Sequence, residues 1–267
     1  MKRYTPTNLI RVALFFICAA AQTNNLSAEC SSPGTILDRY VAALGGQTAL
    51  RQVQTIIVKA RESEPHTFNP ASTRHSFYTL KWKAPDKVRA RPRYFLSFAD
   101  WRFDGKAWSI DTGRQSHNND NQPPWRVKLK AEYPYNDDPP FMMYRITANP
   151  IMLATAKDLY SSLELGSSNL QSPGTCVLFA NGKSGYGARR RDILHFDAQS
   201  GLLKLWEIQV GLPRQVSYVR FTFSDYRTVA PIKIPFRIYF DFYQASFRLT
   251  KVTLNAPIDD EEFVPKR

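Results

Sequence analysis

The chain has 267 residues, 13% of them aromatic, and a formal net charge of +13 at pH 7. This length suits one large β domain or two small ones, and because no Gly/Ser-rich linker divides the sequence, we expect one domain. The sequence contains no Gly-x-Ser-x-Gly, no His-Glu-x-x-His and no phosphate-binding glycine loop, which excludes the commonest enzyme signatures. Four aspartates could in principle pair as acid and base: Asp104, Asp111, Asp192 and Asp197. Three of them stand at expected strand ends or turns, where aspartate has a structural role, so we expect no enzyme and no cofactor.

The first 28 residues have the organisation of a secretory signal peptide. Basic residues precede an apolar run over residues 12–21, and Leu26-Ser27-Ala28 supplies a cleavage site before Glu29. The apolar run is too short to span a membrane as a helix. We therefore predict that the mature chain, residues 29–267, is exported to the periplasm and is not stably inserted in a membrane.

Removing the signal peptide leaves 33 basic and 23 acidic side chains, a net charge of +10. Such a charge suits anionic lipid headgroups or anionic envelope polymers, or it serves solubility alone. Nucleic acid is a poor candidate because the chain is predicted to be exported. The basic row Arg89, Arg91 and Arg93 also lacks the interleaved aromatic residues of a nucleic-acid surface.

Two cysteines, Cys30 and Cys176, remain in the mature chain. In an oxidising compartment such a pair can form a disulfide, which would tie the start of the mature chain to a strand near its middle. Alternatively, Cys176 is a buried free thiol, because it is followed by the apolar residues Val177, Leu178 and Phe179. The sequence leaves both possibilities open.

The mature chain is expected to begin with a short amphipathic helix. Apolar residues recur at helical spacing from Ile36 to Leu44, and Gly45-Gly46 ends the helix. A strand is expected over residues 55–60. The polar segment 61–76 is expected to be a loop, and because its two histidines have no third ligand nearby, we predict no metal site there.

From Phe77 to Ile110, apolar and cationic residues alternate, which predicts consecutive strands of a curved sheet. One expected face carries the apolar residues Tyr78, Leu80, Trp82, Ala84, Val88, Ala90, Pro92, Tyr94, Leu96 and Phe98. The other carries Lys81, Lys83, Arg89, Arg91 and Arg93, and we expect these arginines to face solvent. Asp104-Gly105, between Trp101 and Trp108, predicts a hairpin turn.

The second half of the chain is expected to be almost entirely β. A strand over residues 125–133 comes first, and Asn149-Pro150 then opens a second amphipathic helix that continues to Leu163 and is closed by Gly166. Further strands are expected over residues 189–196, 202–210, 216–223, 232–242 and 247–254. Nine or ten short strands predict a single antiparallel sheet large enough to curl. Both helices would bury their apolar sides on its concave face, which makes the fold class mainly β (α+β).

Several short motifs follow one another between residues 34 and 265. They are Leu80-Lys81-Trp82-Lys83-Ala84-Pro85, Phe103-Asp104-Gly105-Lys106, Asn149-Pro150-Ile151-Met152-Leu153, Phe196-Asp197, Gly201-Leu202-Leu203, Asp225-Tyr226-Arg227, Asn255-Ala256-Pro257 and Phe263-Val264-Pro265. Their order resembles the LolA-like superfamily of periplasmic outer-membrane lipoprotein carriers, which also includes envelope stress-sensor domains. The resemblance implies an incomplete antiparallel β-barrel whose interior accepts acyl chains and holds no catalytic group. Carriers of this family usually have an arginine where this chain has Ala84, which departs from the pattern of a strict lipoprotein carrier.

The leading hypothesis is a non-catalytic periplasmic binding or carrier protein for lipids or lipid-modified proteins, with an acyl chain held in an apolar half-barrel. The expected ligand-binding residues are Trp82, Tyr94, Leu96, Phe98, Trp101 and Trp108 on the sheet, with Met142, Met143, Ile151, Met152 and Leu153 on a helical lid. Each of these residues could instead pack a continuous core. The alternative is an envelope interaction or stress-sensor module of the same fold, in which Arg89, Arg91, Arg93 and Arg189–Arg191 engage an acidic partner.

Overall fold

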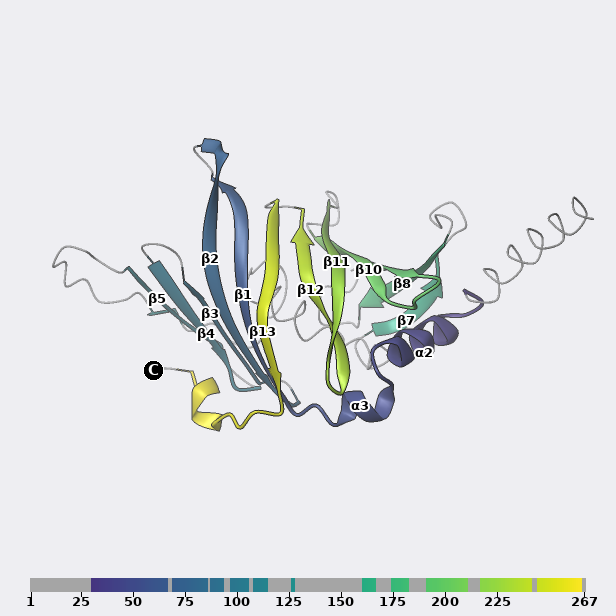
Figure 1. The fold of residues 1–267 in the computed structure, drawn as a ribbon, viewed down its shortest axis with the longest axis horizontal. Coiled ribbons are helices and arrows are strands. Elements are labelled where there is room, and N and C mark those ends of the chain that lie inside the picture. The colour runs from purple at the N-terminus through teal and green to yellow at the C-terminus, as the bar shows by residue number, and fades with distance from the viewer. Residues whose placement is uncertain are drawn as a thin grey trace, which may run out of the picture.

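The computed structural model describes one antiparallel sheet with helices beside it (Figure 1). The described residues are 30–66, 69–85, 87–93, 97–105, 108–114, 126–127, 160–166, 174–182, 191–210, 217–241 and 244–265. The predicted signal peptide lies outside them. The predicted fold class, mainly β with a single curved antiparallel sheet, is confirmed.

The sheet has 13 strands in two halves that each follow chain order. The first half contains β1 (Thr55–His66), β2 (Asn69–Lys83), β3 (Lys87–Arg93), β4 (Ser97–Phe103), β5 (Trp108–Arg114) and β6 (Arg126–Val127). The second contains β7 (Tyr160–Leu165), β8 (Thr175–Gly182), β9 (Arg191–Asp197), β10 (Leu203–Val210), β11 (Ser217–Val229), β12 (Ile232–Phe240) and β13 (Ala245–Leu254). The antiparallel pairing of β1 with β13 joins the halves, so the order is β6-β5-β4-β3-β2-β1-β13-β12-β11-β10-β9-β8-β7.

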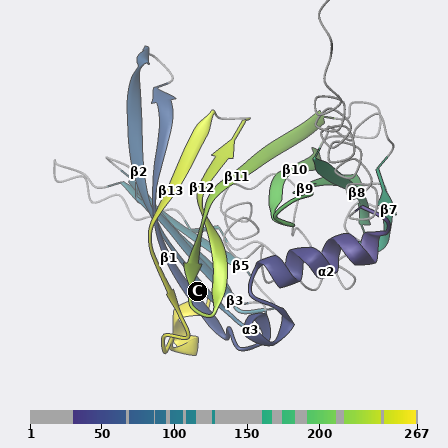
Figure 2. The same ribbon diagram turned by 45° about the vertical axis from the view of Figure 1, so that its right-hand side comes forward.

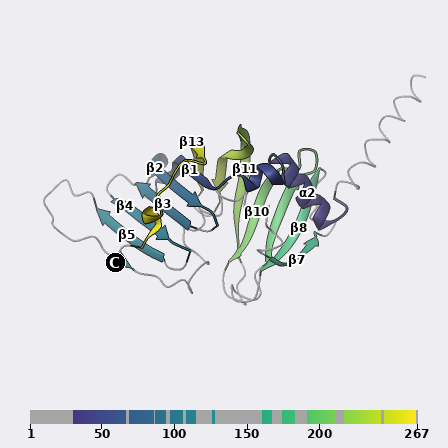
Figure 3. The same cartoon turned by 90° about the horizontal axis from the view of Figure 1, so that it is seen from below.

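The sheet is curved and open. Its end strands in the described order, β6 and β7, do not pair with each other, as the expected incomplete barrel requires. The half containing β7–β10 curls around towards helix α2 (Pro33–Ala43), which lies across it in both Figure 2 and Figure 3. One hydrophobic core includes side chains of α2 and of one face of the sheet. We call that face of the sheet the inward face, and the opposite one the outer face. A second short helix, α3 (Gln47–Arg51), leads into β1.

Local signals in the sequence define helix α2. Ser32 caps it by accepting a hydrogen bond from the Thr35 amide at 3.0 Å, and Pro33 starts the first turn. Ile36, Leu37 and Tyr40 are buried, and the Tyr40 ring lies 5.2 Å from that of Phe196 on β9. The helix therefore closes part of the inward face, as predicted for the first of the two helices.

Gly45 allows the chain to leave this helix close to the sheet. Its φ of +123° disfavours any other residue, and a Cβ atom there would lie 2.6 Å from the carbonyl oxygen of Pro231. The chain before α2 is held as well, because Cys30 forms a disulfide with Cys176 on β8, with Cα atoms 5.4 Å apart. The disulfide alternative is thus the correct one.

Three predicted elements differ from the structure. Residues 61–66 and 69–76 form the ends of two long strands, not a loop, and the hairpin of β1 and β2 rises above the rest of the sheet in Figure 1. Polar residues on both faces of this projecting hairpin obscured the strand alternation. Residues 160–165 form strand β7, not the end of a helix, because they pair with β8. The expected helix over residues 149–159 lies outside the described residues.

The third difference is that the expected run from Val88 to Phe98 is two strands. β3 ends at Arg93 and β4 begins at Ser97, and the register pairs Phe98 with Arg93. Phe98 therefore shares the register of the cationic residues, not of the apolar ones, because even-numbered residues face inward on β3 and odd-numbered residues face inward on β4.

Candidate functional site

The inward face of the first half of the sheet is apolar across four strands. Cross-strand pairing aligns Ile56, Trp82, Val88 and Phe103 in one row, and Val58, Leu80, Ala90 and Trp101 in the next. Six of these side chains are at most 3% exposed, and Phe103 and Trp101 pack partly buried against the same core. The structure thus confirms the predicted alternation and brings Trp82 and Trp101 to one face.

Both of these tryptophans carry an unpaired donor. The indole nitrogens of Trp82 and Trp101 are buried and have no hydrogen-bond partner among the residues that the structure describes. An unsatisfied buried donor costs about 1–3 kcal/mol, and native proteins usually pair such groups with protein, water or ligand. Two such donors on one apolar face identify a place where a bound molecule with acceptor oxygens would gain affinity.

Of the remaining predicted site residues, only Trp108 and Phe98 lie within the described strands. Trp108 is the register partner of Phe103, and Phe98 is placed by its backbone pairing alone. The other predicted residues lie outside the described ranges: Tyr94, Leu96, Met142, Met143, Ile151, Met152 and Leu153. Their role as ligand contacts or lid stays a prediction.

The inward face becomes polar towards the tip of the β1–β2 hairpin. Glu62, only 6% exposed, is the register partner of Ser76 and accepts a hydrogen bond of 2.7 Å from the Tyr78 hydroxyl. The Ser76 hydroxyl is buried without a partner. One pair further along, Arg74 donates to Glu64. The expectation of a loop over residues 61–76 concealed this cluster, whose signal is polar residues at the inward positions of both strands.

The environment of Glu62 shifts its acidity. Burial raises the pKa of its carboxyl from 4.5 to about 7; the Tyr78 hydrogen bond and Arg74 oppose this rise, while Glu64 adds to it. The apolar Phe247, the register partner of Glu62 on β13, packs its ring against that of Tyr78 at 5.7 Å. Glu62 is therefore a carboxyl that titrates near neutral pH at the polar end of an apolar face.

We expect Glu62→Gln to remove a pH dependence of stability. Because the folded pKa is above the ordinary value, the folded state binds the proton more tightly, and the contribution of Glu62 is fully present below pH 4.5. The Glu62 contribution to the free energy of unfolding is lost as the pH rises through about 7. Between pH 5 and pH 8 the loss is about 2–3 kcal/mol. Urea unfolding of parent and variant at pH 5 and pH 8 measures it, and a constant difference between the two proteins would contradict the assignment.

On the outer face, a cluster of charges fastens the C-terminal segment to the sheet. Asp100 on β4, whose side chain is 5% exposed, accepts hydrogen bonds from Arg89 at 2.9 and 2.7 Å and from Arg102 at 3.0 Å. Arg89 also donates to Glu262 at 2.9 Å, in the short helix η2 (Asp260–Phe263), whose Phe263 is fully buried. Burial alone would raise the pKa of Asp100, but Arg89 and Arg102 outweigh it and lower the pKa below its ordinary value.

This cluster corrects the prediction for the basic row of β3. The arginines do stand opposite the apolar face, but the Arg89 side chain is only 12% exposed and binds acidic groups of its own chain. Arg91 and Arg93 are more accessible. Arg89 is therefore a structural residue and is not available to an acidic partner.

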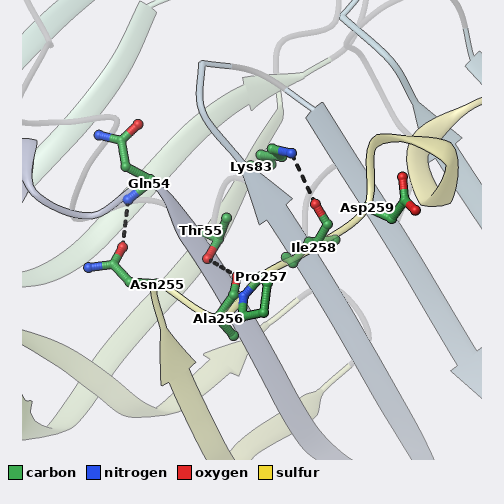
Figure 4. A pocket seen from close by; sticks show the side chains of 8 residues that line it. All are labelled: Gln54, Thr55, Lys83, Asn255, Ala256, Pro257, Ile258 and Asp259. Atoms are coloured by element: carbon green, nitrogen blue, oxygen red, sulfur yellow. Dashed lines mark hydrogen bonds between the residues drawn. The ribbon is translucent and has the colours of Figure 1, made fainter.

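An open groove of about 600 Å³ lies where β1 begins and the chain leaves β13 (Figure 4). Its polar groups bind one another. The backbone amide of Gln54 donates to the side-chain oxygen of Asn255 at 2.8 Å, and the Thr55 hydroxyl donates to the Ala256 carbonyl at 2.7 Å. Lys83 likewise donates to the Ile258 carbonyl at 3.0 Å. These bonds attach the C-terminal segment, so the groove is a structural junction and the inward face is the better candidate for binding.

The described residues show neither a metal site nor a membrane-spanning helix. In the described ranges, no group of three or more His, Cys, Asp or Glu side chains is arranged to hold a metal ion. Among the described helices, none combines the length and apolarity needed to cross a membrane.

Comparison with known proteins identifies the fold. No protein-family model and no curated protein matches this sequence. A DUF1329 family protein from Desulfovibrio piger is similar in structure, with 9% identity over 86% of this chain and 96% of that chain and a TM-score of 0.55. An outer membrane lipoprotein-sorting protein domain from Vibrio parahaemolyticus shares 9% identity over 85% of this chain and 94% of that chain, with a TM-score of 0.50.

A LolA superfamily protein from Nitrosomonas europaea also matches, at 11% identity over 87% of this chain and 97% of that chain, with a TM-score of 0.49. The predicted resemblance to lipoprotein-sorting proteins is confirmed as a likeness of fold that covers most of the chain. At such low identity, the likeness shows the fold and does not identify a ligand.

Proposed function

We propose that this protein is a non-catalytic periplasmic carrier that holds the acyl chain of a lipid or lipid-modified protein on the inward face of its open sheet. The observation that carries the proposal is the continuous pair of apolar rows on this face, where the buried indole nitrogens of Trp82 and Trp101 have no partner among the described residues. Burial of an acyl chain gains about 0.8 kcal/mol per methylene, so such a surface binds it without charged contacts.

The polar cluster at the hairpin gives the proposed ligand a direction. An amphiphile would lay its chain along the apolar rows with its carboxyl or ester oxygens at the indole donors of Trp82 and Trp101, and a larger headgroup would extend towards Glu62, Ser76 and Tyr78. The lipoprotein-sorting name of the Vibrio relative agrees with this class of ligand. The disulfide supports an oxidising compartment, which in turn agrees with export of residues 29–267 as one domain.

The test is binding of a fluorescent fatty acid to the parent protein and to Trp101→Phe. Phenylalanine keeps most of the aromatic packing and removes only the indole donor. If that donor binds the ligand, the variant should lose one hydrogen bond of about 1 kcal/mol, which is roughly a fivefold rise in Kd. Mass spectrometry of lipids extracted from the natively purified protein identifies the ligand class.

Trp206→Phe is the matched control. The indole of Trp206 donates to Asp192 at 3.3 Å, so this donor is already used within the protein. The control should lose stability but keep the parent affinity for the fatty acid. If the parent binds no acyl ligand, the carrier function is wrong, and if Trp101→Phe binds as tightly as the parent, only the role of the indole is wrong.

A further inference from the structure

A row of four arginines and one phenylalanine crosses the outer face of the sheet, away from the core. Its members are register partners on the neighbouring strands β3, β2, β1, β13 and β12: Arg93, Phe77, Arg61, Arg248 and Arg237. We call this set the arginine row. All five residues are exposed, Phe77 to 60%. Two residues along the strands, a parallel row adds three more cations: Arg91, Lys59 and Lys251.

The arrangement of the arginine row is unfavourable for the isolated protein. Arg61 stands directly opposite Arg248, and Arg248 directly opposite Arg237. Like charges in directly opposed positions of neighbouring strands destabilise a sheet. The arginine row adds no stability to the isolated folded protein, whereas an external anionic surface would attract all of its charges.

The part of the chain that the structure describes does not neutralise the row. Within the described residues, no ion pair involves an arginine of the row, although seven other arginines are paired: Arg74, Arg89, Arg91, Arg102, Arg191, Arg220 and Arg227. Asp225 lies within electrostatic reach of Arg237 and Arg248, but Arg227 holds it through hydrogen bonds of 3.0 and 2.7 Å. The charge of the arginine row is therefore directed at solvent.

We propose that the arginine row is a docking surface for an anionic phospholipid membrane. Neighbouring strands are about 4.8 Å apart, so the row spreads its charges over about 19 Å, which suits an extended anionic surface better than one small anion. Phe77 stands between Arg93 and Arg61, and Tyr239, 41% exposed, lies on the same side of β12 as Arg237. Aromatic side chains among cations favour the headgroup region of a bilayer.

The test is cosedimentation of the purified protein with vesicles of phosphatidylglycerol and phosphatidylcholine, or of phosphatidylcholine alone. Each basic residue near an anionic membrane contributes roughly a fivefold gain in affinity. Arg61→Gln with Arg248→Gln should therefore weaken binding to anionic vesicles roughly 25-fold, and its urea midpoint should stay equal to or rise above that of the parent. Arg51→Gln with Lys204→Gln is the control, which removes two exposed charges elsewhere, of which Lys204 is paired with Asp197, and it should change binding less than threefold.

Three results would overturn the proposal. The first is equal loss in both double variants, which would show that net charge alone attracts the vesicles. The second is equal binding to neutral and anionic vesicles, and the third is no vesicle binding by the parent at low ionic strength, as expected if the row binds an acidic protein instead. None of these measurements depends on the acyl ligand, so membrane docking and the carrier function can fail independently.

Discussion

Replacing Cys30 and Cys176 together by serine is expected to lower the free energy of unfolding by about 5 kcal/mol. The two cysteines are 146 residues apart in sequence, and by chain-entropy arguments a cross-link that closes so long a loop restricts the unfolded chain by about this amount. The disulfide also anchors the chain at the start of α2, which covers part of the inward face. Urea unfolding monitored by tryptophan fluorescence measures the change.

The parent protein in strong reductant is the control for this double variant. Reduction breaks the same cross-link without altering any other side chain, so both proteins should unfold at similar urea concentrations. An oxidised parent that is no more stable than the double variant would contradict a structural role for the disulfide.

Arg89→Ser is expected to lower the free energy of unfolding by about 3 kcal/mol. It leaves the carboxylate of Asp100 buried with only part of its hydrogen bonding, and breaking a buried ion pair from one side costs about 3–5 kcal/mol. The remaining hydrogen bond from Arg102 places the expected loss at the lower end of that range. Glu262 loses a partner as well, which should loosen η2.

Arg93→Ser, on the same strand and the same face, is the matched control. Arg93 is exposed and the change should cost less than about 0.5 kcal/mol. Because the pKa of Asp100 is lowered in the folded state, the cost of Arg89→Ser should be present at neutral pH and diminish as the pH falls below about 4. Equal effects of the two substitutions at pH 7 would contradict the assignment of Arg89 to a buried network.

The two proposals assign different tasks to the two faces of one sheet. The apolar inward face would hold an acyl chain, and the arginine row on the outer face would bring the protein to the membrane that supplies or receives it. The long hairpin of β1 and β2 contributes to both, because Glu62 and Ser76 point inward while Arg61 and Phe77 point outward. A carrier of this kind would separate affinity for cargo from affinity for membrane.

The sequence by itself determined the elements whose signals are local. Helix α2 follows from the Ser32 cap, Pro33 and the spacing of Ile36 and Tyr40. Strands half-buried in the core, such as β12, follow from alternation, since Ile232, Ile234 and Ile238 meet the core while Lys233, Arg237 and Tyr239 are exposed. The order of short motifs was enough to recognise the fold.

Only the tertiary structure decided what depends on residues distant in sequence. The Cys30–Cys176 bond, the pairing of β1 with β13 and the burial of Arg89 beneath Glu262 each join segments more than 140 residues apart. Alternation says which residues share a face, but it does not say what covers that face. The same cationic row therefore contains Arg89, buried and paired, and Arg93, exposed, because the C-terminal segment folds over one and not the other.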